Sequence, residues 1–332
     1  MTAAELDDLL STPRAETLAA LERCSGDIIV LGAGGKMGPT VARMAARATG
    51  RRVIAVSRWS TPDSALALRE VGVETITCDL LDRDAVARLP DVPNVVFMAG
   101  QKFGTTNAPA ATWGMNTLVP ALCAERFRHS RIVAFSTGNV YALSPVASNG
   151  SREGDPLSPV GEYAASCVGR ERIFELYADR FGVRVAIVRL NYAIDLRYGV
   201  LVDIALRVRR GDAVPLDMGF VNVIWQGDAV RISLECMPLA SAPPFVVNVT
   251  GTAKLSVRAA GEWFADRFDV APRFLGTEGA DALLSDTSTM SATFAAPEMP
   301  ISRLFELVAD WVERGGQTLG KPTRFETRDG TF

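Results

Sequence analysis

Histidine is almost absent from this sequence of 332 residues, which contains only His129. That scarcity excludes metal centres built from several histidines, and with them the zinc-protease motif HExxH. The five cysteines are odd in number, widely spaced and never arranged as CxxC. This pattern is typical of reduced thiols rather than of disulfides or a zinc site. We therefore expect no metal site and a cytoplasmic protein.

Long apolar runs and a strong charge imbalance are also missing. No run reaches the roughly 18 apolar residues that a membrane span requires. The first residues, MTAAELDDLLSTPRAE, are acidic and lack the basic-then-apolar order of a signal peptide. The net charge of −3 gives no reason to expect the basic stripe of a nucleic-acid-binding surface. We expect neither membrane nor nucleic acid as a partner.

What the chain does have is a regular alternation of apolar runs and helical patterns. Residues 1–25 predict a short helical extension, with leucines at helix-like spacing. From residue 26, strands are predicted at 27–31, 52–57, 74–78, 94–98, 131–135 and 183–189. Helices are predicted at 37–48, 64–71, 83–89, within 111–127 and at 161–181. Strands without polar alternation are covered on both faces, so the pattern predicts a doubly wound parallel (Rossmann) sheet of the α/β class.

Beyond residue 190 the pattern becomes looser and richer in proline and glycine. Two amphipathic helices are predicted there, at 257–268 and 301–314. We expect three parts: a helical extension at 1–25, a dinucleotide-binding core at 26–190, and a small mixed lobe at 191–332 from which some strands return to the core. The lobe would cover the carboxyl ends of the strands, where ligands bind in such sheets.

The first strand runs directly into the turn Gly32-Ala33-Gly34-Gly35-Lys36-Met37-Gly38, and a helix follows. Glycines at the first, fourth and seventh places allow a sharp turn and a close approach to a pyrophosphate. The helix N-terminus then offers its free N–H groups to the phosphate charge. A glycine triplet by itself also marks ordinary turns, but the position between a strand and a helix favours dinucleotide binding.

With this GxxGxxG spacing, four further segments resemble the extended short-chain dehydrogenase/reductases, the NAD-dependent epimerase/dehydratase family. Cys78-Asp79-Leu80 resembles the family's adenine-contacting pair, and Met98-Ala99-Gly100-Gln101-Lys102 resembles its Ala-Gly-x-Lys segment. Asn116 falls where the family has a helix asparagine. The segment 135–141, FSTGNVY, resembles the one that carries the active-site hydroxyl. The resemblance covers roughly residues 26–250.

The resemblance implies a nicotinamide cofactor and a set of residues that contact it. These residues belong to the glycine-rich turn, the strand ends and the active-site helix: Gly32, Gly34, Gly35, Lys36, Met37, Gly38, Ser57, Arg58, Asp79, Leu80, Met98, Ala99, Gly100, Lys102, Asn116, Tyr163, Cys167 and Asn191. Three alternatives remain open. Asp79 could cap the following helix, Asn116 could be a surface residue, and Ser136 with Thr137 could be ordinary strand-end hydroxyls.

The resemblance also implies that Thr137 and Tyr163 are the catalytic residues. Family members carry a lysine four residues after the tyrosine, on the same helix face, but this chain has Cys167 there. A tyrosine whose pKa is near 10 needs nearby positive charge to act as a base at neutral pH. Arg170 and Lys102 are the candidate substitutes, and we expect Lys102 to matter more because it follows the Ala-Gly segment beside the cofactor. Cys167 could be a buried filler, and Arg170 a solvated or subunit-contact charge.

These observations support two functions. The first is an NAD(P)-dependent oxidoreductase, epimerase or dehydratase that acts by hydride transfer on a sugar, nucleotide-sugar or sugar acid. The second is an NADP-binding sensor that lost catalysis with its lysine. The second strand ends at Ser57-Arg58 rather than at an acidic residue, which favours NADP while leaving NAD possible. By resemblance the helices within 111–127 and 161–181 form a homodimer interface, with apolar positions at Leu118, Ala121, Leu122, Phe174 and Leu176. The resemblance also implies that Tyr141, Asn191 and Tyr192 line the substrate pocket.

Overall fold

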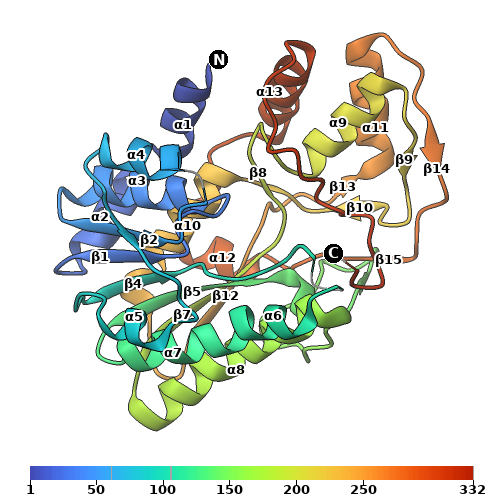
Figure 1. Cartoon of the computed structure of the whole chain (residues 1–332). Helices are drawn as coiled ribbons and strands as arrows, with labels where there is room; N and C mark the ends of the chain where they lie inside the picture. Colours follow the sequence, from blue (N-terminus) through green and yellow to red (C-terminus); the bar gives the residue numbers. More distant parts are fainter. Residues whose placement is uncertain (61, 105–106, 332) are drawn as a thin grey trace.

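A computed structural model of the chain describes residues 1–60, 62–104 and 107–331 (Figure 1). The last residue of the expected lobe, Phe332, lies outside them. A parallel sheet covered by helices forms one half of the molecule, and a lobe of helices and short strand pairs forms the other. No helix in the described ranges is both long and apolar enough to cross a membrane.

The central sheet has seven parallel strands in the order β12-β7-β5-β4-β1-β2-β3. Their bounds are β1 (Ile28–Leu31), β2 (Val53–Ser57), β3 (Glu74–Thr77), β4 (Asn94–Phe97), β5 (Arg131–Thr137), β7 (Arg184–Leu190) and β12 (Phe245–Val249). From β1 the chain adds β2 and then β3 on one side, and it then returns to place β4 on the other side of β1. That change of direction at β1 and β4 is the position where such sheets bind ligands. The predicted α/β fold class is confirmed.

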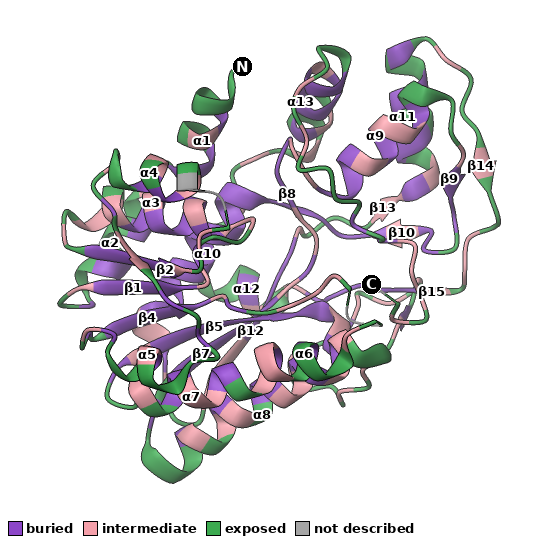
Figure 2. Ribbon diagram, in the orientation of Figure 1, coloured by how far each residue is buried: buried purple, intermediate pink, exposed green. Residues whose placement is uncertain are grey.

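Successive residues of each strand pack on opposite faces of the sheet. Ile28 and Val30 of β1 face one apolar cluster, whereas Ile29 and Leu31 face another. The first cluster is covered by α2 (Ala15–Glu22), α3 (Gly38–Thr49) and α10 (Gln226–Glu235). The second is covered by α5 (Arg83–Ala87), α7 (Val119–Arg126) and α8 (Gly161–Phe181). Figure 2 shows most of the strands buried between these layers, which explains their apolar sequences, whereas the edge strand β3 is partly exposed.

Glycines in the left-handed region end two of the predicted helices. Gly50 caps α3 at φ 59°, and Gly182 caps α8 at φ 68°. The helix expected within 111–127 is divided into α6 (Pro109–Trp113), a π-helical turn η1 (Gly114–Leu118) and α7. The half of the molecule that contains the sheet has four further elements among the described residues. They are α4 (Pro62–Arg69), the 3₁₀ turns η2 (Gly138–Val140) and η3 (Met237–Leu239), and α12 (Ser288–Thr293).

The lobe has its own apolar cluster, built on three helices. These are α9 (Val200–Arg210), α11 (Val257–Phe268) and α13 (Ile301–Glu313). Short strands pair around them: β6 (Ser144–Pro145) with β15 (Asp281–Ala282), β8 (Ala193–Ile194) with β11 (Ile224–Trp225), β9 (Val214–Pro215) with β14 (Phe274–Leu275), and β10 (Phe220–Val221) with β13 (Leu255–Ser256). The helices at 257–268 and 301–313 follow the sequence prediction closely.

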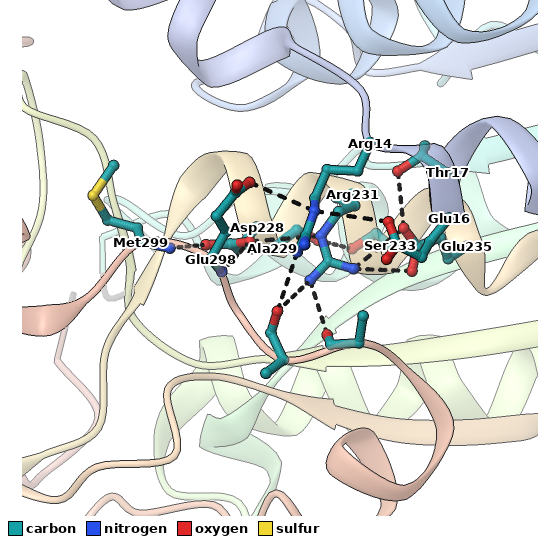
Figure 3. A network of polar contacts seen from close by, with 12 residues as sticks. Arg14, Glu16, Thr17, Asp228, Ala229, Arg231, Ser233, Glu235, Glu298 and Met299 are labelled. Carbon is teal, nitrogen blue, oxygen red and sulfur yellow. Dashed lines mark hydrogen bonds and ion pairs between the residues drawn. The ribbon is translucent and has the colours of Figure 1, made fainter.

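The chain after residue 190 contributes to both halves. β12 extends the central sheet beside β7, and α10 packs against α2 and α3. The N-terminal extension also reaches both, because Leu6 and Leu10 of α1 (Ala3–Ser11) join the lobe cluster and Leu21 of α2 joins the sheet. A buried network around Arg231 fixes α2 and α10 to the segment before α13 (Figure 3).

Candidate active site

A cavity of about 880 Å³ lies at the carboxyl ends of the strands, between the sheet and the lobe. One wall is formed by the glycine-rich turn after β1, and another by the segments that follow β4 and β5. The lobe supplies residues 191–200, and the carboxy-terminal tail supplies Leu319, Lys321 and Thr323. The strand order that places β1 beside β4 therefore creates the cavity.

The glycine-rich turn has no room for side chains at three of its glycines. A Cβ atom on Gly32 would lie 2.6 Å from the Ala99 nitrogen, and one on Gly38 would lie 2.4 Å from the Ala33 oxygen. A Cβ on Gly34 would lie 2.4 Å from the Ser57 hydroxyl oxygen. Gly34 and Gly35 are exposed along the cavity wall where α3 begins. A bare backbone beside a helix N-terminus fits the diphosphate of a dinucleotide.

The structure brings most of the expected cofactor and catalytic residues to the cavity. The residues that line it are Gly32, Gly34, Gly35, Lys36, Met37, Gly38, Met98, Gly100, Lys102, Thr137, Tyr163 and Asn191. Tyr192 lines it as well, but Tyr141 is not among the lining residues, because its buried hydroxyl donates to Asn248 at 2.8 Å and accepts from Arg189 at 2.7 Å.

The remaining expected residues lie around the cavity without lining it. Ser57 packs against Gly34, and Arg58 is exposed beyond it.

Asp79 is exposed and accepts a hydrogen bond from the Leu81 nitrogen at 3.0 Å, whereas Leu80 is buried. The cap of α5 is Asp82, so the alternative that Asp79 caps this helix is wrong. Ala99 is buried beneath the turn at Gly32.

The side chains of Thr137 and Tyr163 meet at the end of β5. A hydrogen bond links the two side chains. The Thr137 hydroxyl oxygen also accepts hydrogen bonds from the Asn139 backbone nitrogen at 3.2 Å and from its amide at 3.0 Å. Thr137 therefore lies at a fixed position beside Tyr163, in the arrangement that an acid/base tyrosine and its partner require.

Burial raises the pKa of Tyr163 well above its ordinary value, and the neighbouring Cys167 adds to the rise. The positive charge of Arg170 and the hydrogen bond to Thr137 act in the opposite direction. Cys167 is fully buried, and burial raises the pKa of its thiol too. The thiol is a neutral neighbour that shares a hydrogen bond with Tyr163. Cys167 therefore cannot supply the charge that a lysine would bring.

Arg170 is not a solvated charge, as the sequence allowed, because it is only 6% exposed. Its guanidinium donates to the Phe135 carbonyl at 2.9 Å and to Asn116 Oδ1 at 2.7 Å. A Cβ on Gly100 would lie 2.3 Å from the Arg170 Nη2 atom, so the glycine makes room for this side chain. The structure thus brings a fixed cation to the cavity wall, next to Tyr163.

Asn116 is fully buried, so the surface alternative is wrong for this residue. Its amide donates to the Gln101 oxygen at 3.0 Å and to the Ser166 hydroxyl at 2.9 Å, and its oxygen accepts from the Gln101 nitrogen at 2.9 Å. These bonds hold the turn after β4 against α8. Asn116 lies at the π-helical turn η1, a feature often found at functional sites.

Lys102 reaches the cavity from the segment after β4. Its Nζ atom lies 5.8 Å from the centre of the Tyr163 ring and 5.9 Å from that of Phe103. Burial lowers the pKa of Lys102 to about 8, while Cys167 and Asp203 raise it. Lys102 and Arg170 therefore approach Tyr163 from two different segments.

A buried ion pair holds β5, β7 and α8 together behind the active site. The Arg189 guanidinium donates to Glu171 at 2.7 Å, and both side chains are almost inaccessible to solvent. Ser136, which precedes Thr137, donates to the same carboxylate. Ser136 is thus engaged in this network, which leaves Thr137 as the hydroxyl that faces Tyr163.

Sequence reasoning missed several residues that line the cavity. Arg197 and Tyr198 come from the lobe, Asp7 comes from α1, and Lys321 comes from the carboxy-terminal tail. No motif marks them, since each reaches the cavity only through the packing of distant segments. In the described part of the chain, no cluster of three or more His, Cys, Asp or Glu side chains could hold a metal ion.

The parallel sheet, the glycine cradle and the Thr137–Tyr163 pair define a dinucleotide-binding enzyme. The model of the NAD dependent epimerase/dehydratase family matches residues 28–194. This chain belongs to that family, and it is an enzyme of the extended short-chain dehydrogenase/reductase type. No curated protein matches the sequence significantly.

Solved structures with the same fold include sugar-nucleotide enzymes. A UDP-glucose 4-epimerase from Thermotoga maritima is 17% identical with a TM-score of 0.73, covering 87% of this chain and 99% of its own. A UDP-glucose 4-epimerase from Thermus thermophilus, in complex with NAD, is 20% identical with a TM-score of 0.69, over 86% and 98%. A dTDP-glucose 4,6-dehydratase from Streptomyces venezuelae is 18% identical with a TM-score of 0.70, over 87% and 98%.

Proposed function

We propose that this enzyme transforms a sugar carried on a nucleotide, or a related sugar acid, by reversible oxidation of a hydroxyl-bearing carbon. The observation that carries the proposal is the Thr137–Tyr163 pair at the wall of a cavity large enough for a dinucleotide and a substrate. The similar structures include a UDP-glucose 4-epimerase with UDP-glucose and a dTDP-glucose 4,6-dehydratase, which supports this substrate class.

A nicotinamide dinucleotide held at Gly34, Gly35 and the N-terminus of α3 would supply the hydride chemistry of this mechanism. Thr137 hydrogen-bonds the reacting oxygen of the substrate and orients it. Tyr163 takes the proton from that oxygen during oxidation and returns it during reduction. Arg170 and Lys102 stabilise the tyrosinate form, which is the task of the lysine in other members of the family. Two hydrogen bonds hold Arg170 in place before substrate binds, and the Lys102 Nζ atom lies 5.8 Å from the centre of the Tyr163 ring.

NADP is the proposed preferred cofactor. The end of the cavity that adjoins the turn after β2 is lined by Arg43 and Ser64, and the exposed Arg58 lies beyond it. The carboxylates that line the cavity are Asp7 and Asp195, and both pair with Arg197 of the lobe. The adenosine end therefore offers positive charge to a 2′-phosphate, without a carboxylate to repel it.

A homodimer in the cytoplasm completes the proposal. The exposed apolar side chains Leu118, Leu176 and Phe181 lie on the helices that pack side by side outside the sheet. All five cysteines are free and buried, which suits a reducing compartment.

The function is tested by a cofactor-saturated turnover assay over UDP-glucose, UDP-glucuronic acid and dTDP-glucose. Product analysis must accompany nicotinamide absorbance, because an epimerase returns its hydride and leaves no net change in absorbance. Tyr163→Phe removes only the hydroxyl, so turnover should be abolished while the dissociation constant of the cofactor changes less than about threefold, since no charged contact is lost. A Tyr163→Phe enzyme that retains full turnover overturns the mechanism.

A further inference from the structure

Lysine is rare in this chain, and its distribution is uneven. Of the four lysines in the sequence, three line the active-site cavity: Lys36, Lys102 and Lys321. They come from the glycine-rich turn, from the segment after β4 and from the carboxy-terminal tail. The fourth, Lys254, lies in the lobe and donates to backbone carbonyls at Val146 and Ser148.

The carboxylates that line the cavity do not neutralise these lysines. Arg197 donates to Asp7 at 2.9 Å and to Asp195 at 2.7 Å, so both acids are already paired. Asp203 lies close enough to Lys36 to raise its pKa, but the same carboxylate accepts hydrogen bonds from the Thr323 nitrogen and hydroxyl. The lining of the cavity as a whole therefore carries an excess of positive charge, with Lys36, Arg43, Lys102, Arg170, Arg197 and Lys321 against Asp7 and Asp195.

Lys36 reaches across the cavity toward the lobe. Its Nζ atom lies 3.3 Å from the centre of the Tyr198 ring and 4.3 Å from that of Phe103. Burial, together with the charges of Lys102 and Lys321, lowers the pKa of Lys36 to about 7, although Asp203 acts in the opposite direction. An ammonium group held between two rings, close to other cations, would gain stability from an anion.

The tail is fixed on both sides of Lys321. The Leu319 nitrogen donates to the Arg197 oxygen at 3.0 Å, and the Thr323 nitrogen donates to Asp203 Oδ2 at 2.7 Å. Two residues further on, Phe325 is 2% exposed within the lobe cluster. These anchors hold the Lys321 backbone at the rim of the cavity, while its side chain stays exposed to an incoming ligand.

We propose that Lys36 and Lys321 form an anion subsite that binds a phosphate group of the substrate. The proposal deepens the proposed function, on which it rests for the identity of the ligand as a substrate. It makes Lys321, a residue outside the matched family region, a determinant of substrate specificity. Two separate ammonium groups act as point charges, and suit a compact, doubly charged phosphate better than a single carboxylate.

A phosphate at this subsite has two sources, the substrate and the diphosphate of the dinucleotide. The dinucleotide diphosphate is expected at Gly34, Gly35 and the N-terminus of α3, on the sheet side. Lys321 and the ring of Tyr198 that receives Lys36 both belong to the opposite side, which the lobe and tail form. We therefore assign the subsite to the substrate.

The test titrates full-length protein, saturated with its nicotinamide cofactor, with inorganic pyrophosphate and with UDP in a calorimeter. Lys321→Ala should weaken the binding of pyrophosphate and of UDP by about tenfold or more, which is the effect expected when one charge-assisted contact is lost. Lys321→Arg should restore most of the affinity, and Lys254→Ala is the matched control that should change nothing. Acetate, a single carboxylate, should bind at least about tenfold more weakly than pyrophosphate.

Cofactor binding to the same variants separates the two sources. If Lys321→Ala weakens the cofactor as much as it weakens UDP, the phosphate belongs to the dinucleotide and the proposal is wrong. Unchanged affinity for pyrophosphate and UDP overturns it as well. Loss of turnover on every sugar nucleotide, with Lys321-dependent UDP binding intact, would instead reject the proposed reaction and leave the subsite standing.

Discussion

At the scale of single residues, the active site depends on how Tyr163 acquires positive charge without a lysine at position 167. Cys167 is fully buried and packs with Val140 and Tyr141, beside the proposed acid/base residue Tyr163. A lysine there would place a further buried cation beside Arg170 and Lys102, both already close to Tyr163. The replacement of the lysine and the burial of Arg170 are therefore parts of one arrangement.

Cys167→Ala tests whether the thiol takes part in catalysis. If Cys167 only fills space, kcat should fall only about two- to fivefold, because the lost sulfur leaves a small cavity and little else. A direct contact with ribose or substrate would instead cost on the order of 1–3 kcal/mol, or about tenfold and more in kcat/KM. Steady-state kinetics distinguish the two results, with Cys236→Ala as the control, because Cys236 is fully buried and is not among the residues that line the cavity.

The pH dependence of oxidation tests the substitute cations. Tyr163 must lose its proton in this direction, so a lost cation should raise the pKa of Tyr163 and move the onset of activity to higher pH. The shift should be about one pH unit for each 1.36 kcal/mol of lost interaction. The groups that face Tyr163 are Cys167, Arg170, Thr137 and Lys102.

Arg170→Met should shift the profile further than Lys102→Met. The sequence favoured Lys102, but in the structure the charge of Arg170 lowers the pKa of Tyr163. Arg170→Lys should restore the profile in part, which separates charge from folding effects. Lys254→Met is the control. An unchanged pH profile in both Arg170→Met and Lys102→Met would contradict the role of these cations.

Arg58 tests the cofactor preference. Arg58→Ala should weaken NADP binding by about 1.5–3 kcal/mol, the strength of a charge-assisted hydrogen bond, and should leave NAD binding nearly unchanged. Fluorescence titration of both cofactors measures the ratio. Wild-type protein that binds NAD as tightly as NADP would show that the preference is wrong.

At the scale of elements, the network around Arg231 joins three segments that are far apart in sequence (Figure 3). Arg231 on α10 donates to Glu235 at 3.1 Å and to the Ala295 oxygen at 3.0 Å, while Thr17 on α2 donates to Glu235 at 2.8 Å. Asp228 accepts from the Glu298 nitrogen at 2.9 Å. The side chains of Arg231, Asp228, Glu235 and Thr17 are almost completely buried, so their contacts hold α2 and the segment before α13 in place.

Arg231→Met should lower the free energy of unfolding by about 3–5 kcal/mol, because it leaves two buried carboxylates without their cation. Chemical denaturation measures the change. Arg303→Ala is the matched control, since Arg303 pairs with Glu306 on an exposed helix face and should cost less than about 1 kcal/mol. Equal losses in the two variants would contradict the structural role of the network.

At the scale of the whole molecule, the outer faces of η1, α7 and α8 carry the exposed apolar side chains expected at an interface. Leu118 is 47% exposed and Leu176 is 45% exposed. Phe174, which the sequence placed among the interface candidates, packs edge-on against Phe97 at 5.3 Å beneath α8. The apolar surface available for an interface on these helices thus contains fewer residues than the sequence suggested.

Leu176→Asp should convert the proposed dimer to a monomer, since a carboxylate in an apolar interface loses its hydration without gaining a partner. Light scattering at micromolar concentration measures the mass. Leu275→Asp is the control, because Leu275 is 63% exposed on β14 of the lobe. A wild-type monomer would reject the homodimer.

The sequence by itself determined six of the seven strands of the central sheet and the helices between them. Most of these strands are continuous apolar runs, and two of the helices, α3 and α8, end at glycines, and both signals depend on neighbouring residues alone. The glycine-rich turn could be found for the same reason, since it follows the first strand directly, whereas Thr137 and Tyr163 were found through the family resemblance of their segments. The family and the fold class followed from these local patterns.

Only the tertiary structure decided where charge gathers in the active site. Arg170 is seven residues from Tyr163, and the sequence could not show that Gly100 and Asn116 enclose it. Lys321 reaches the cavity because Asp203 and Arg197 fix the tail there. Likewise β12 joins the sheet beside β7 although 54 residues separate Leu190 from Phe245 along the chain. Contacts between such distant segments depend on the packing of the whole chain, and no local pattern encodes them.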